Sequence, residues 1–73
     1  MRDLGSQAQP AVPALIEACG DSVYMVRISS IRALGRIGAG ASNAIPRLRA
    51  LLQDGDSMVQ RAAADAIQRI EEP

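Results

Sequence analysis

The chain contains two copies of one sequence pattern offset by thirty-three residues, and this internal repeat restricts its fold more than any other feature. Residues 4–40 align with residues 37–73 without a gap, and eleven aligned pairs are identical. Identical pairs include Gly5/Gly38, Ala11/Ala44, Pro13/Pro46, Leu15/Leu48, Asp21/Asp54, Val26/Val59 and Arg36/Arg69. Repetition at this period is typical of solenoid proteins, in which neighbouring units cover each other's apolar faces.

Each repeat predicts two helices, because apolar residues follow helical spacing and no window alternates as a strand does. The first helix of the first repeat is expected over about Ala11 to Cys19. Its counterpart is expected from about Ala44 to Gln53, with Asn43 as its N-cap. Pro13 and Pro46 fall in the first turns of these helices, where the missing N–H costs little.

The second helix of each repeat is longer and is predicted to bury one stripe of small and apolar residues. Gly38 is expected to end the first of these helices. Asp56 is a good N-cap for the second, whereas Val23 at the matching position cannot cap, so Asp21 or Ser22 must serve. The predicted stripes are Val26, Ser30, Ala33, Leu34 and Ile37 in one helix and Val59, Ala63, Ala66, Ile67 and Ile70 in the other.

Gly35 is unusual inside a helix, where it costs up to about 1 kcal/mol relative to alanine. Close approach by a neighbouring helix would account for it. The sequence therefore predicts tight helix packing at this position.

These motifs resemble the bacterial HEAT repeats of the phycobilisome-lyase-like type. The resemblance rests on the segments LGSQAQPAVPALIEACGDSVYMVRISSIRALGRIG and IGAGASNAIPRLRALLQDGDSMVQRAAADAIQRI. It implies an all-α fold, an α-α superhelix or solenoid built from two helical hairpins plus an N-terminal helix stub. It leaves function open, because such repeats serve many partners, and an accessory role of the bilin-lyase type is one possibility that it implies.

We expect one domain over residues 1–73. Residues 1–5 align with the end of a preceding second helix, residues 6–38 form repeat 1 and residues 39–73 form repeat 2. About three or more units are usually needed to bury a solenoid core. The chain is therefore expected either to be part of a longer array or to self-associate, and the sequence does not separate these alternatives.

Composition disfavours catalysis and metal binding. The chain has no His and one Cys, so the usual nucleophile–base pairs cannot form and no cofactor or metal ligand set is expected. Eight arginines balance eight acidic residues, which argues against a general electrostatic grip on nucleic acid or membranes. No apolar run can cross a bilayer and the first residues do not read as a signal peptide, so a cytoplasmic protein is expected.

Cys19 lies on the apolar stripe of the first helix. A buried thiol that packs as a small hydrophobe is the favoured interpretation. An intermolecular disulfide is the alternative if this end of the chain is exposed.

The candidate binding surface is the face of the second helices, which lines the concave side in proteins that the chain resembles. An apolar patch edged by arginine is typical of protein-binding surfaces, so we expect a protein partner or another copy of the chain. The alternative is that Ile28 and Ile31 only pack against a neighbouring helix. The predicted site residues are Tyr24, Ile28, Ile31, Arg32 and Arg61.

A phosphate-binding stripe of arginines is a less favoured interpretation, because stacking aromatics are lacking and acidic residues are interspersed. The stripe would use Arg32, Arg36, Arg47, Arg49, Arg61 and Arg69.

The acidic residues between the helices are interpreted as structural. Asp54 and Asp56 lie where they cap the following helix and face the positive end of its dipole, and Asp21 matches Asp54 in the other repeat. Arg27 matches an arginine that, in the family it resembles, bonds to neighbouring turns. The resemblance therefore implies Asp54 or Asp56 as its partner.

Overall fold

The computed structural model describes residues 11–72, and every regular element within them is helical. The elements in chain order are α2 (Ala11–Ala18), α3 (Tyr24–Ile37), the 3₁₀ segment η1 (Gly38–Ala44), α4 (Ile45–Leu51) and α5 (Ser57–Glu71). The all-α prediction is confirmed for this part of the chain. The predicted helix stub over residues 1–5 lies outside the described residues.

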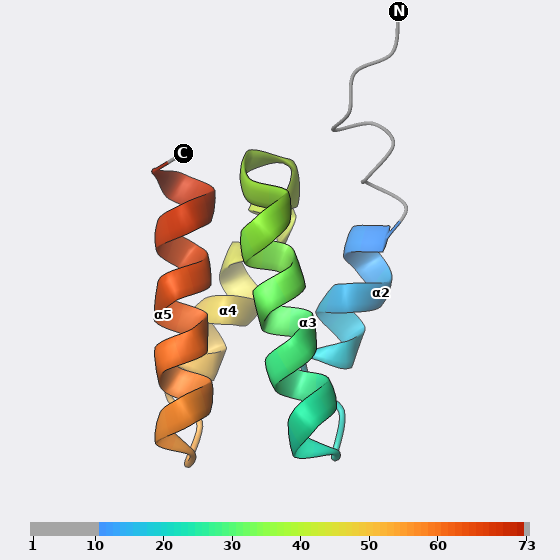
Figure 1. Cartoon of the computed structure of the whole chain (residues 1–73), viewed down its shortest axis with the longest axis vertical. Helices are drawn as coiled ribbons and strands as arrows, with labels where there is room; N and C mark the ends of the chain where they lie inside the picture. Colours follow the sequence, from blue (N-terminus) through green and yellow to red (C-terminus); the bar gives the residue numbers. More distant parts are fainter. Residues whose placement is uncertain (1–10, 73) are drawn as a thin grey trace, which may run out of the picture.

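The two long helices, α3 and α5, run side by side in the same direction, with the shorter α4 behind them and α2 next to α3 (Figure 1). Their predicted positions agree with the structure to within a few residues. Gly38 ends α3 as expected and adopts a positive φ of 73°, a conformation that glycine tolerates without strain.

The start of α4 differs from the prediction. The chain passes through η1 and enters α4 with Ala44 already in the helical region, so α4 begins at Ile45 and is shorter than expected. The N–H of Ile45 already has a partner in the carbonyl oxygen of Ser42. Asn43 is therefore not the N-cap that the sequence suggested, because the backbone before α4 is itself helical.

Gly35 is a point of close approach between α3 and α5. A Cβ atom built on Gly35 would lie 3.3 Å from the Cα of Ala66 and 3.4 Å from the Cδ of Arg69, which is tighter than ordinary contact. The predicted close helix neighbour is confirmed. Helices that meet at small residues bring their backbones together, and the large residues on either side can then interlock.

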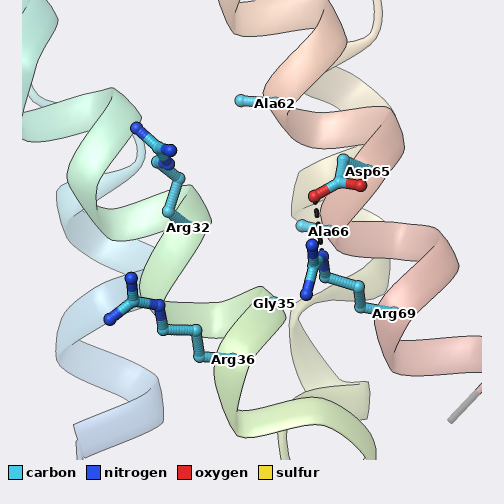
Figure 2. A pocket seen from close by; sticks show the side chains of 7 residues that line it. All are labelled: Arg32, Gly35, Arg36, Ala62, Asp65, Ala66 and Arg69. Atoms are coloured by element: carbon cyan, nitrogen blue, oxygen red, sulfur yellow. Dashed lines mark hydrogen bonds and ion pairs between the residues drawn. The ribbon is translucent and has the colours of Figure 1, made fainter.

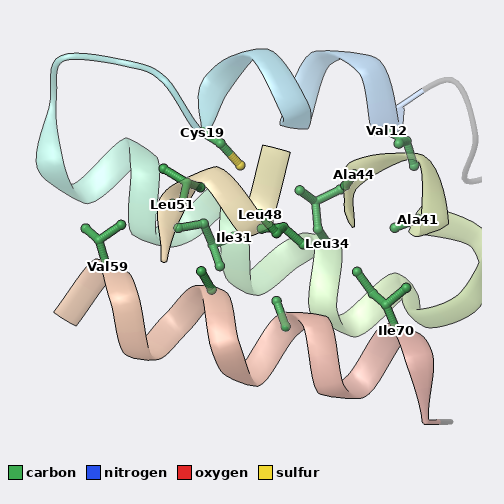
Figure 3. Packing of buried hydrophobic residues seen from close by; sticks show 12 residues of the cluster. Val12, Cys19, Ile31, Leu34, Ala41, Ala44, Leu48, Leu51, Val59 and Ile70 are labelled. Carbon is green, nitrogen blue, oxygen red and sulfur yellow. The ribbon is translucent and has the colours of Figure 1, made fainter. Parts of the chain in front are cut away.

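The core lies between α3, α4 and α5 and is closed at one side by α2 (Figure 3). It consists of aliphatic side chains and alanines, with one cysteine. The buried apolar residues are Val12, Cys19, Ile31, Leu34, Ala41, Ala44, Leu48, Leu51, Val59, Ala63, Ala66 and Ile70.

Ile31 belongs to this core and has no exposed surface, so its prediction as a binding residue is wrong. The alternative, that it packs against neighbouring helices, holds for this residue. The buried stripe of α3 is displaced toward α5: Ile31 and Gly35 are buried with Ser30 and Leu34, whereas Val26, Ala33 and Ile37 are only half-buried. The cause is that α3 is covered by α5 as well as by the shorter helices.

We predict that Gly35→Leu destabilises the fold by about 1–3 kcal/mol through overpacking, even though leucine is the better helix former. The matched control is Gln68→Leu, at the equivalent but exposed position of α5, which should change stability by less than about 0.5 kcal/mol. Urea unfolding followed by circular dichroism measures both. Equal effects of the two substitutions would contradict the close approach.

Cys19 is fully buried, and its burial raises the pKa of the thiol, opposed by the positive charge of Arg47. A thiol whose pKa is raised by folding contributes stability below the ordinary thiol pKa and loses it as the pH rises through the folded value. We predict slow labelling by a disulfide reagent in the folded chain and fast labelling in urea. We also predict an alkaline loss of stability that Cys19→Ala reduces; fast labelling of the folded chain would refute the burial.

Candidate functional site

The exposed surface between α3 and α5 forms two adjoining shallow clefts, which we call the α3/α5 groove. Their volumes are about 200 and 340 Å³, at or below the lower end of small-molecule sites, so the groove suits side chains of a partner better than a buried ligand. The groove is lined by Ile28, Arg32, Gly35 and Arg36 from α3 and by Met58, Arg61, Ala62, Asp65, Ala66 and Arg69 from α5.

Three of the five predicted site residues come together in this groove. Ile28 and Arg32 from α3 and Arg61 from α5 line the same cleft. Tyr24 does not line either cleft. It is half-buried against the core, and the guanidinium of Arg27 lies over its ring at 5.8 Å from the centroid.

The large apolar side chains of the groove lie at one end, together with Arg61, and two further arginines lie at the other. Ile28 and the 54 % exposed Met58 lie near the starts of α3 and α5, whereas Arg36 and Arg69 lie near their ends. The floor of the end with Arg36 and Arg69 is made of small residues, because α3 and α5 meet there at Gly35 and Ala66 (Figure 2).

The positive charge on the α5 side of the groove is partly neutralised. Arg69 Nε donates to Asp65 Oδ2 at 2.8 Å, an ion pair between exposed residues one helical turn apart (Figure 2). The other ion pair within residues 11–72 joins Arg49 to Glu71 at 3.4 Å, and its arginine belongs to α4. Neither ion pair includes Arg32, Arg36 or Arg61.

Sequence reasoning missed Met58 and Ala62 as groove residues and treated Asp65 only as an interspersed charge. The missing information was the side of α3 on which α5 packs. Once Ala66 is known to face Gly35, the positions one and two turns earlier on α5 follow from helical spacing. The pair Asp65–Arg69 was readable directly from its i,i+4 spacing.

Arg27 has partners other than those expected. Its Nη1 donates to the backbone carbonyl oxygens of Asp21 at 3.0 Å and Ser22 at 3.3 Å, in the turn just before its own helix. The expected bond to Asp54 or Asp56 is therefore wrong. The arginine folds back on its own turn, where free carbonyl oxygens lie within reach.

The turns before α3 and α5 make matching hydrogen bonds. Asp21 Oδ1 accepts from the N–H of Val23 at 2.7 Å, and Asp54 Oδ1 accepts from the N–H of Asp56 at 2.8 Å. Gln60 Nε2 donates to the carbonyl oxygen of Asp54, as Arg27 does to Asp21. These aspartates hold the turns, as expected, and are already occupied by the backbone.

The two turns differ at the N-cap. Asp56 caps α5 by accepting from the N–H of Met58 at 2.8 Å, which confirms its predicted role. Val23 stands at the N-cap of α3 without a side-chain bond. Asp21 lies two residues before Val23 and accepts a hydrogen bond from the N–H of Val23. Neither Asp21 nor Ser22, the two residues suggested from the sequence, is therefore the N-cap of α3.

Among residues 11–72 no group of three or more His, Cys, Asp or Glu side chains is placed to hold a metal ion. No helix within the same residues is long and apolar enough to cross a membrane.

A family model of HEAT repeats matches residues 1–68. The chain belongs to the HEAT-repeat family. HEAT repeats generally mediate protein–protein interaction and typically act as scaffolds rather than catalysts. Comparison with curated proteins and with solved structures finds no match.

In this HEAT-repeat chain, we predict that Val23→Asp stabilises the fold by about 0.5–1 kcal/mol by giving α3 the cap that Asp56 gives α5. Asp56→Ala should destabilise it by about 1 kcal/mol. Thermal unfolding by circular dichroism measures both. A stabilisation by Val23→Ala as large as that by Val23→Asp would show that the removal of exposed valine, and not capping, is responsible.

Proposed function

We propose that the chain is a non-catalytic interaction module that binds a protein segment, or another copy of itself, through the α3/α5 groove. The observation that carries this proposal is the meeting of Ile28, Met58, Arg32 and Arg61 at one exposed cleft. Apolar anchors edged by arginine are the composition that protein interfaces favour.

The position of the groove supports the same conclusion. It lies on the side of the molecule formed by α3 and α5, whereas α4 lies behind them (Figure 1). Ile31 and Val59, in the core below the groove, are fully buried. The exposed parts of Ile28 and Met58 are therefore not used by the fold.

We also infer that residues 6–38 and 39–73 are two repeats of a superhelix with a period of thirty-three residues. The matching hydrogen bonds of Asp21 and Asp54 support this organisation, as does the burial of the aligned residues Ser30 on α3 and Ala63 on α5. We assign the repeats to the phycobilisome-lyase-like type on the strength of their turn and helix motifs.

The test is a selection of peptides by phage display on the purified chain, followed by anisotropy measurements on the selected peptides. We predict that Met58→Ser and Ile28→Ser each weaken binding by at least about fivefold, because truncating an interface anchor costs more than about 1 kcal/mol. Leu52→Ser is the matched control, since Leu52 is a partly exposed apolar residue that does not line the groove.

Failure to select any peptide, or selected peptides that bind the groove variants and the control equally, would contradict the proposal. Light scattering distinguishes the two proposed occupants of the groove, a segment of a different protein and another copy of the chain. A mass that increases with concentration, and that Met58→Ser returns to the monomer value, identifies another copy of the chain as the partner.

A further inference from the structure

The exposed face of α3 carries a row of three residues spaced one helical turn apart: Ile28, Arg32 and Arg36. Arg32 is central to this face, because it lines both clefts of the α3/α5 groove and also a third cleft on the other side of α3. Arg36 lines two of the three. In Figure 2 both guanidiniums extend from α3 away from α5.

The positive charge on this row is not balanced within its own helix. Helix α3 contains Arg27, Arg32 and Arg36 and no acidic residue. Arg27 is occupied by the turn before the helix, and no ion pair within residues 11–72 includes Arg32 or Arg36. Like charges four residues apart destabilise a helix, so the pair Arg32 and Arg36 is unfavourable until an anion binds between them.

A favourable interaction with the helix dipole is available to only one of the two arginines. Arg36 lies in the last turn of α3, where a positive charge interacts favourably with the helix dipole. Arg32 lies in the middle of the helix, where the dipole gives no such benefit. Its exposed position between three clefts places its guanidinium within reach of a partner in any of them.

The spacing of the row matches an extended polypeptide. Side chains four residues apart on a helix are separated by about 6 Å along its axis. Alternate side chains of an extended strand point the same way and are about 6.5–7 Å apart. Three alternate residues of an extended segment can therefore face Ile28, Arg32 and Arg36 in turn.

We propose that this face binds an acidic protein segment in which an apolar residue and two carboxylates occupy alternate positions. The apolar residue packs between Ile28 and Met58, and the carboxylates pair with Arg32 and Arg36. This inference rests on the proposed function and specifies the chemistry of its partner.

The charges around the row favour an acidic polypeptide over a nucleic acid. Asp21, Asp54 and Asp56 lie in the turns before α3 and α5, next to the Ile28 end of the row, and repel a strand that carries a phosphate at every step. Tyr24 is the chain's one aromatic residue, and it is half-buried beneath Arg27, so it offers no free face for stacking a base.

The experiment measures anisotropy of labelled decapeptides at low and moderate salt. One carries Leu-Ser-Glu-Ser-Glu at its centre, a second carries these residues in reverse order, and a third replaces both glutamates by glutamine. A ten-nucleotide oligodeoxythymidine is the nucleic-acid probe. The protein variants are Arg32→Gln, Arg36→Gln and, as a control with the same charge change on α4, Arg47→Gln.

We expect one of the two glutamate peptides to bind the unmodified chain, with an affinity that falls as salt rises. Replacement of both glutamates should weaken it by at least about tenfold, and Arg32→Gln or Arg36→Gln by about tenfold each, since one charge-assisted contact is lost. Arg47→Gln should change it by less than about twofold. Circular dichroism confirms that each variant is folded, which exposed positions on a helix surface permit.

Three results would overturn the inference: equal binding of the glutamine peptide, an effect of Arg47→Gln as large as that of Arg32→Gln, or tighter binding of the oligonucleotide than of the peptides. Absence of peptide binding at millimolar concentration would overturn it as well. If the phage-display selection yields groove-dependent peptides without carboxylates, the proposed function stands and only the acidic partner is rejected.

Discussion

The contact between Gly35 and Ala66 determines how the rest of the structure is arranged. Because no side chain separates the helices there, α3 and α5 come together closely enough for Ile31 to be buried in the core beneath them. The same contact leaves a floor of small residues between the arginines of the groove. One glycine thus sets both the packing of the core and the depth of the surface above it, at a helix-propensity cost of about 1 kcal/mol.

Charge is distributed unevenly over a chain whose formal net charge is zero. Acidic residues hold the turns, where their carboxylates accept backbone N–H groups. Arginines occupy the exposed faces of the helices, and α3 and α4 contain no acidic residue. Net charge therefore describes this molecule poorly: a partner meets a basic helix surface beside acidic turns, and this contrast favours one orientation of a bound segment over the other.

The sequence predicted the helices and the cap at Asp56 well because helical spacing and capping are local properties. It predicted a close neighbour at Gly35 because glycine inside a helix is costly unless another helix packs there, although it did not identify that neighbour. It predicted the binding face less well. Whether Ile31 lies at the surface or in the core depends on which side of α3 meets α5. That side is set by contacts between residues distant in the chain. Arg27 was given the wrong partner because the family resemblance pointed to neighbouring turns, while its own turn presented nearer carbonyl oxygens. Ile28, Arg32 and Arg61 were placed on one face because the second helices line the concave side in the family that the chain resembles, and in the structure all three line one cleft.

The close contact at Gly35 also makes the two long helices unequal. The residue of α5 that matches Gly35 in the alignment is Gln68, which is exposed. A glutamine side chain occupies space that a glycine leaves empty, so the α3–α5 spacing depends on a residue that α5 itself lacks at the matching position. The exposed side of α5 that carries Gln68 is therefore not equivalent to the side of α3 that meets Ala66, even though both helices follow the same sequence pattern.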